Sequence, residues 1–158
     1  MKRMIACLLL LLLALTSLDS SFAEAKNWVW VSSNDFATYS IDSDSVSKYR
    51  GTIYYWNKRQ YIESPERTAY IEQLKQYRRM EGDDDTDFSD LWAVSKYMHA
   101  YLSMDGTVYF KILDIFYLDH GGNVISTRVY PEDDAVLMKA PKNSVGYEEY
   151  NVARHYAK

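Results

Sequence analysis

The pattern of hydrophobic and polar positions divides the chain into strand-like and helix-like segments. Residues 28–31 and 36–41 are short runs rich in aromatic and β-branched side chains, and the small polar residues between them favour a turn. The next run of this kind, residues 52–56, follows Gly51. These segments predict three strands, of which the first two form a hairpin.

Strand patterns return strongly in the second half of the chain. Residues 94–104 and 107–118 flank Asp105-Gly106, a dipeptide that favours a tight hairpin turn of type I′. Residues 124–129 follow a glycine-containing turn and form the sixth run. Three consecutive antiparallel strands are therefore predicted here.

Two segments carry helix signals instead. The hydroxyl of Ser64 can cap a helix, and Pro65 suits the first helical position. The apolar residues Tyr70, Leu74 and Tyr77 then recur at spacings of three and four, which places them on one face of the helix. This helix is predicted to end near Met80, within a helical excursion over residues 60–91. Ser144 introduces a second, terminal helix whose acidic residues come early and whose basic residues come late, as the helix dipole favours.

Three strands, a helix, three strands and a helix thus follow one another along the chain. Strands joined by hairpins form antiparallel sheets, and the apolar face of such a sheet needs a covering layer. The predicted fold class is α+β: a six-stranded antiparallel sheet with the C-terminal helix packed on one face and an additional helix inserted between strands three and four.

The first 25 residues have the pattern of a signal peptide. Lys2 and Arg3 precede an apolar run at residues 5–15, and residues 23–25 (AEA) offer the small side chains that signal peptidase recognises. An uncleaved anchor helix is disfavoured because the run is about 11 residues long and a bilayer needs about 20. We predict a cleaved signal peptide at 1–25 and a single exported domain at 26–158, periplasmic or at the cell surface, with no transmembrane anchor.

Composition narrows the class of partner. The chain has 18 basic and 22 acidic residues and a net charge of −4, whereas nucleic-acid binders carry a basic face. Its 15 tyrosines and 4 tryptophans all follow residue 25. Such rings favour sheet structure and are also typical of binding surfaces. Cys7 is the only cysteine and lies in the predicted signal peptide, so the exported domain has no thiol.

Sequence motifs for catalysis or metal binding are missing. His99, His120 and His155 do not form a helical zinc motif, and the sequence contains no nucleophile elbow or phosphate-binding glycine loop. The acidic run at residues 83–90 fails as a calcium loop because Phe88 occupies the glycine position, which leaves a solvated loop or weak cation binding as alternatives. We predict no catalytic residues, no metal site and no cofactor, and therefore no enzyme.

Three basic residues of the middle helix are the candidates for partner binding. Lys75, Arg78 and Arg79 are three and four positions apart and therefore share one stripe of that helix. Such a stripe can meet an anionic glycan or an acidic protein. The same residues are also favoured simply by their position near a helix C-terminus, so both interpretations stay open.

Five short motifs, in the same order along the chain, resemble the bacterial surface-adhesin E-like family: residues 28–31 (WVWV), 39–42 (YSID), 53–56 (IYYW), 116–125 (FYLDHGGNVI) and 141–146 (PKNSVG). The resemblance spans nearly the whole predicted domain apart from the inserted helix. It implies a small exported domain with a curved six-stranded antiparallel sheet and a C-terminal helix on its concave side. It also implies binding to host or matrix proteins.

Two main hypotheses for function follow. The first is an exported, non-catalytic binding protein of the bacterial cell envelope, an adhesin that contacts a protein or glycan outside the cytoplasm through exposed aromatic residues and charged loops. The alternative is a periplasmic carrier of a small apolar ligand between sheet and helix. A filled space under the helix favours the first, and an apolar cavity favours the second. A third hypothesis, an enzyme, requires His99 or His120 beside a carboxylate and a nucleophile in one cleft.

Overall fold

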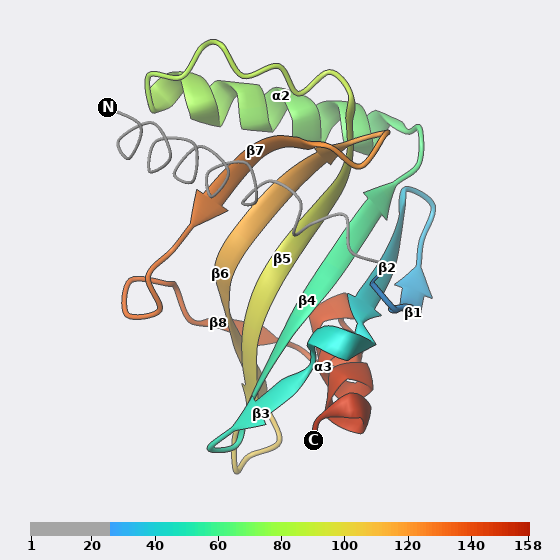
Figure 1. Ribbon diagram of the computed structural model, residues 1–158, viewed down its shortest axis with the longest axis vertical. Helices are drawn as coiled ribbons and strands as arrows, with labels where there is room; N and C mark the ends of the chain where they lie inside the picture. Colours follow the sequence, from blue (N-terminus) through green and yellow to red (C-terminus); the bar gives the residue numbers. More distant parts are fainter. Residues whose placement is uncertain (1–25) are drawn as a thin grey trace, which may run out of the picture.

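Eight strands and two α-helices make up the described part of the computed structural model, which covers residues 26–158 (Figure 1). The predicted signal peptide, residues 1–25, lies outside the described residues. The elements in chain order are β1 (Trp28–Ser33), β2 (Ala37–Asp42), the 3-10 turn η1 (Ser43–Ser45), β3 (Ser47–Tyr49), β4 (Thr52–Tyr61), α2 (Pro65–Met80), β5 (Leu91–Leu102), β6 (Val108–Asp119), β7 (Val124–Val129), β8 (Met138–Ala140) and α3 (Val145–Tyr156).

The strands form one antiparallel sheet with the order β1-β2-β4-β5-β6-β7, and the short strands β3 and β8 pair with β4 and β6. The predicted α+β class is confirmed, but the predicted count of six strands is wrong. The six predicted strands are those of the main path. β3 and β8 have three residues each, too few to show a pattern. They form because β2 covers only the second half of β4, and β7 only the second half of β6. The inserted helix consequently follows the fourth strand of the chain instead of the third.

Capping residues fix the ends of the helices. The Ser64 hydroxyl accepts a hydrogen bond from the backbone N–H of Arg67 at 3.2 Å, and Ser144 caps α3 in the same way. Helix α2 ends at Met80, and Gly82 follows with a φ of 81°, the left-handed conformation that often terminates helices. Both helices begin where the sequence predicts, and α2 also ends there.

The hairpin turn between β5 and β6 differs from the predicted type I′ turn. The backbone N–H of Gly106 donates to the carbonyl of Ser103 at 3.0 Å, so Met104 and Asp105 are the central residues. A type I′ turn needs a positive φ at both central residues, and neither has one. Gly106 instead has a φ of 78°, as in a three-residue loop closed by a left-handed glycine.

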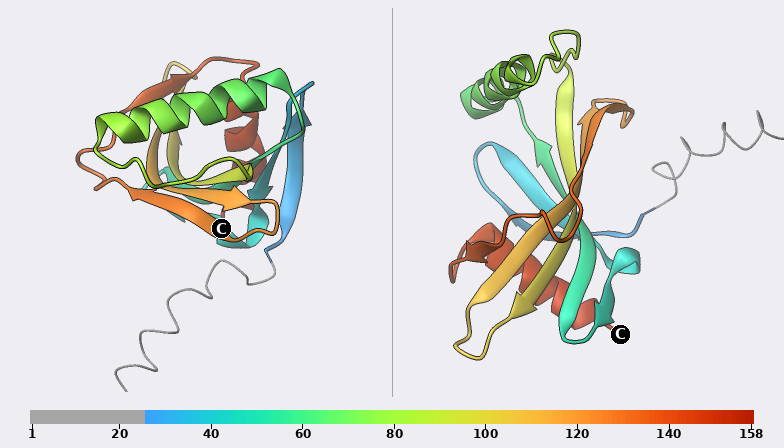
Figure 2. Two further views of the ribbon diagram at one scale, coloured as in Figure 1. Left: turned by 90° about the horizontal axis from the view of Figure 1, so that it is seen from above. Right: turned by 90° about the vertical axis from the view of Figure 1, so that its left-hand side faces the viewer.

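The two faces of the sheet differ in what covers them. Alternate residues of a strand point to opposite faces. Along β4 the residues that point toward the helices are Ile53, Tyr55, Asn57, Arg59 and Tyr61, and those that point away are Tyr54, Trp56, Lys58 and Gln60. Helix α3 packs against β1, β2 and β4, and Tyr70 of α2 stacks on Tyr61 at 5.5 Å. Figure 2 shows both helices on the same side of the sheet. We call this side the helix face and the other side the outer face.

The segment after α2 closes one end of the helix face. Phe88 is fully buried, and its ring meets the edge of Tyr117 at 5.4 Å between ring centres. The Arg67 guanidinium donates to the backbone carbonyls of Leu91 at 2.7 Å and Ser89 at 3.3 Å. These contacts attach the acidic segment to α2 and the sheet. The stretch of the helix face between α2 and α3 contains the candidate site.

Candidate functional site

Four polar residues lie on the helix face among mostly apolar neighbours. Asn57 and Arg59 belong to the inward-facing positions of β4, and Lys96 of β5 is the register partner of Asn57. Glu149 enters from α3. Asn57 and Glu149 are only 7% and 4% exposed, so they have lost most of the hydration that surface polar groups keep. We call these four residues the polar cluster.

Hydrogen bonds of Asn57 hold the cluster together. Its Nδ2 donates to Oε2 of Glu149 at 2.9 Å, and its Oδ1 accepts the backbone N–H of Lys96 at 3.1 Å. Its backbone carbonyl accepts the Ser95 hydroxyl at 2.7 Å. An amide that is engaged at both ends has one preferred orientation. Asn57 therefore fixes the Glu149 carboxylate against the sheet.

The electrostatics of the cluster leave positive charge in excess. Burial raises the pKa of Glu149 to about 7, against the opposing hydrogen bond from Asn57. The positive charges of Lys96 and Arg59 also oppose that rise. Burial lowers the pKa of Lys96, against the attraction of Glu149. Near neutral pH the cluster thus combines two basic side chains with a carboxyl group that is only partly ionised.

Among the described residues, Glu149 attracts the two basic side chains without forming a close ion pair with either. No ion pair within 4.0 Å joins Lys96 or Arg59 to a carboxylate of residues 26–158. The Nε of Arg59 is buried and has no hydrogen-bond acceptor in the same part of the chain. A buried donor left in this state costs about 1–3 kcal/mol. An acceptor brought by a ligand would remove that cost.

Aromatic rings surround the Arg59 guanidinium. The distances from its Cζ to the ring centres are 4.9 Å for Tyr61, 5.2 Å for Phe36, 5.5 Å for Tyr39 and 6.0 Å for Tyr70. Rings attract a cation to their faces, whereas guanidinium N–H groups donate in their own plane. The rings therefore hold Arg59 in place without using its hydrogen-bond donors.

A cavity of about 160 Å³ lies between the polar cluster and the first turn of α3. Its lining beyond the cluster is mostly apolar and comprises Tyr39, Met98, Phe110, Ile112, Val145 and Gly146. The space under the helix is thus not filled, and it is not purely apolar either, because one wall carries charged groups. Charged donors that line a small, partly open cavity suit an anionic group such as a carboxylate.

The polar cluster was not predicted, although the sequence holds two signals of it. Asn57 and Arg59 continue the inward alternation of the strand that was predicted to end at residue 56. Glu149 lies four positions after Val145 and three before Val152, whose apolar side chains suit the side of the helix toward the sheet, so it shares their stripe. A charged residue at a core-facing position is uncommon and marks such a site.

The predicted partner-binding residues Lys75, Arg78 and Arg79 line one surface at the C-terminal half of α2. The acidic segment after the helix folds back on them. Arg78 lies 2.9 Å from Asp83, and Arg79 lies 3.9 Å from Asp84. Acidic side chains of the protein itself therefore offset part of the positive charge of this stripe, and its role in partner binding stays a prediction.

His99 and His120 lie away from the polar cluster. His99 is on the outer face, where its Nδ1 is 2.6 Å from Oε1 of Glu132 and its ring is 5.0 Å from that of Tyr54. The His120 ring packs on Trp92 at 4.3 Å between ring centres. A carboxylate thus accompanies His99, but the cavity of the helix face is lined by other residues.

No protein-family model, curated protein or solved structure matches the chain. The resemblance to the surface-adhesin E-like family therefore stays a prediction. Within residues 26–158, no helix is long and apolar enough to cross a membrane. In the same range, no group of three or more His, Asp or Glu side chains is placed to hold a metal ion.

Proposed function

We propose that this protein is a non-catalytic binding protein that holds a small carboxylate-bearing ligand in the cavity between the sheet and α3. The observation that carries the proposal is the pair of basic side chains, Arg59 and Lys96, that lines this cavity without a close ion pair in the described chain, together with the Arg59 Nε that lacks a hydrogen-bond acceptor there. A ligand carboxylate supplies an acceptor for the Arg59 Nε and a close ion-pair partner for both side chains. With the predicted signal peptide, the protein becomes a carrier outside the cytoplasm.

A single negative charge fits the cluster better than two. The basic side chains number two, and Glu149 offsets part of their charge when it is ionised. A monocarboxylate restores the balance, whereas a dianion would also repel the Glu149 carboxylate. When Glu149 carries its proton, its O–H can in addition donate to a ligand oxygen.

The test is a titration of the purified protein with butyrate and, as the cationic counterpart, butylamine, followed by calorimetry and amide chemical shifts. The variant Lys96→Met removes one of the two charges and keeps the length of the side chain. Lys58→Met is the matched control, because Lys58 is a half-buried lysine of the outer face.

We expect butyrate to bind and Lys96→Met to weaken that binding by about tenfold or more, the effect of one lost hydrogen bond to a charged group. Lys58→Met should bind butyrate as the unchanged protein does. The proposal fails if butyrate does not bind, if butylamine binds equally well, or if both lysine variants behave alike.

Adhesion through the outer face is a second proposal, and the row of aromatic rings on that face supports it. Trp56 lies 5.2 Å from Tyr97 and 5.3 Å from Phe116, and both described α-helices lie on the other side of the sheet (Figure 2). Trp30, at 64% exposed, and Tyr49, at 60%, add large apolar surface.

The test of this second proposal is binding of the purified protein to immobilised extracellular-matrix proteins and glycans. Replacing Trp30 and Tyr49 by serine should abolish this binding. Unchanged binding would mean that another surface contacts the partner.

A further inference from the structure

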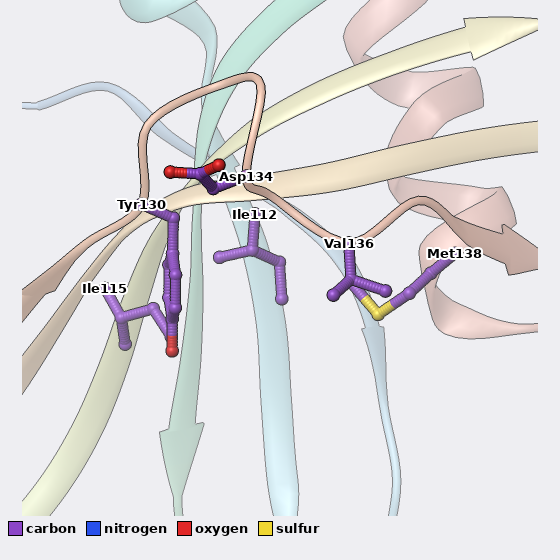
Figure 3. A pocket seen from close by; sticks show the side chains of 6 residues that line it. All are labelled: Ile112, Ile115, Tyr130, Asp134, Val136 and Met138. Carbon is purple, nitrogen blue, oxygen red and sulfur yellow. The ribbon is translucent and has the colours of Figure 1, made fainter.

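A second and more apolar cavity adjoins the proposed carboxylate site. It measures about 220 Å³ and is lined by Ile112, Ile115, Tyr130, Asp134, Val136 and Met138. Figure 3 shows Ile112, Val136 and Met138 side by side beneath the loop that joins β7 to β8, with Ile115 next to the Tyr130 ring. Five of its six lining residues offer mainly apolar surface.

The two cavities share a wall. Ile112 lines both of them. The register between β5 and β6 places Ile115 opposite Lys96 and Ile112 opposite Met98, and an irregularity at Tyr97/Met98 lies between these pairs. Because of this irregularity, two isoleucines three positions apart both line the apolar cavity. They are about 10 Å apart along the strand. The strand register therefore places Ile115, a lining residue of the apolar cavity, next to Lys96, a lining residue of the other cavity.

The charge of the lining residues changes from positive to negative between the carboxylate site and the far end of the apolar cavity. Lys96 and Arg59 lie at the inner end, whereas Asp134, which is exposed, lies at the outer cavity. Val136 at the same cavity is 73% exposed, so that end opens to solvent. A ligand anion is attracted to the inner end and repelled by Asp134. One orientation, with the anionic group inward, is therefore favoured.

We propose that the ligand is an amphipathic monocarboxylate of the medium-chain fatty-acid type, with its carboxylate at Arg59 and Lys96 and its apolar chain along Ile112 and Ile115. This inference rests on the proposed function, because it assigns a chemical class to the ligand of the same site. Each cavity alone is smaller than typical small-molecule pockets of about 300–1,000 Å³, and the two together reach that range. The apolar cavity then supplies affinity, and the polar cluster supplies orientation and specificity.

The experiment compares decanoate, butyrate and 1-decanol, each below its aggregation concentration, by calorimetry and amide chemical shifts on the purified protein. Val136→Asp places a charge at the open end of the apolar cavity. Val129→Asp is the matched control, because Val129 is 71% exposed on β7 and lies outside the cavity lining. Both positions are exposed, so neither change removes a core side chain.

We expect decanoate to bind at least about thirtyfold more tightly than butyrate. Each buried methylene raises affinity roughly three- to fourfold, so burial of only three of the six additional methylenes gives this factor. Val136→Asp should weaken decanoate binding about tenfold and leave butyrate binding unchanged, whereas Val129→Asp should affect neither. Decanol should bind at least tenfold more weakly than decanoate.

Two kinds of failure can be told apart. Equal affinities of decanoate and butyrate, or equal effects of the two aspartate variants, overturn the amphipathic ligand and leave the carboxylate site standing. Decanol binding as tightly as decanoate, with no effect of Lys96→Met on either, overturns the carboxylate site and with it the proposed function. The absence of binding by both carboxylates has the same consequence.

Discussion

The helix face and the outer face of this sheet treat a half-buried lysine differently. On the outer face, burial lowers the pKa of Lys58, and its Nζ lies 4.3 Å from the centre of the Trp28 ring, so a cation–π contact replaces part of the lost hydration. On the helix face, burial also lowers the pKa of Lys96 against the attraction of Glu149, and this lysine lines a cavity. One sheet thus holds a lysine that its own fold satisfies and a lysine that a ligand can satisfy.

Two adjacent tyrosines of β4 also differ between the two faces of the sheet, in how deeply they are buried. Tyr55 of the helix face is 1% exposed, whereas its neighbour Tyr54 on the outer face is half-buried and contacts Tyr97 and His99 at ring distances of 6.2 Å and 5.0 Å. The alternation of β4 therefore assigns one tyrosine to the core and the next to a surface. Strand β4 thus divides its aromatic residues between the buried core and the outer face.

The largest expected effect comes from breaking that division at Tyr55. Tyr55→Ala should lower the free energy of unfolding by about 3–5 kcal/mol, because it opens a cavity in the core. Tyr54→Ala should cost about 1 kcal/mol, because the outer face is partly solvated and holds less buried area. Urea denaturation of both variants measures the difference. Equal losses would mean that the outer face is packed as tightly as the helix face.

Glu149 should make stability depend on pH. Its pKa in the folded state, about 7, lies above its ordinary value of 4.5, so the folded state binds this proton more tightly than the unfolded state. The resulting stabilisation is complete below pH 4.5 and is lost as the pH rises through 7, about 3 kcal/mol in all. Asn57, Lys96 and Arg59 face the carboxyl group from the sheet.

Urea denaturation between pH 5 and pH 8 should show this loss in the unchanged protein and not in Glu149→Gln. Glu148→Gln is the matched control, because Glu148 is the adjacent, more exposed glutamate of the same helix. It should keep the pH dependence. If Glu149→Gln and Glu148→Gln share one pH profile, the carboxyl group of Glu149 titrates as an ordinary surface group.

The same proton should also control ligand binding. Between pH 8 and pH 6, Glu149 gains its proton, and the polar cluster becomes more positive while a ligand carboxylate stays ionised. Affinity for decanoate should therefore rise several-fold as the pH falls, and Glu149→Gln should bind equally at both pH values. Calorimetry at pH 6 and pH 8 measures the affinity for decanoate in both proteins. Tighter binding at pH 8 would contradict the charge balance assigned to the cluster.

A structural feature could be predicted from the sequence when the residues that determine it are close together in the chain. The helices could be placed because Ser64 and Ser144 cap them within their own sequence. The strands of the main path show their own hydrophobic patterns, whereas β3 and β8 depend on edges offered by other strands. The polar cluster depends on more distant choices still: the register that sets Asn57 opposite Lys96, and the packing of α3 that brings Glu149 to both. The local signals at Arg59 and Glu149 mark single charged positions toward the core, and only the register and the packing of α3 show that these positions meet.

The smallest effect is expected from changes to Lys75 and Arg79, the basic residues of α2, whose side chains are not part of the sheet. Changing Lys75 and Arg79 to glutamate should alter the free energy of unfolding by no more than about 0.5 kcal/mol, because the Arg79–Asp84 pair and Glu72, the partner of Lys75, are largely exposed. Decanoate binding should not change, whereas retention on an immobilised sulfated glycan at low salt should fall. Unchanged retention would remove the stripe from the list of partner-binding surfaces. A loss of decanoate binding would instead show that the stripe attracts the ligand toward the cavity from a distance, an effect that added salt should then screen.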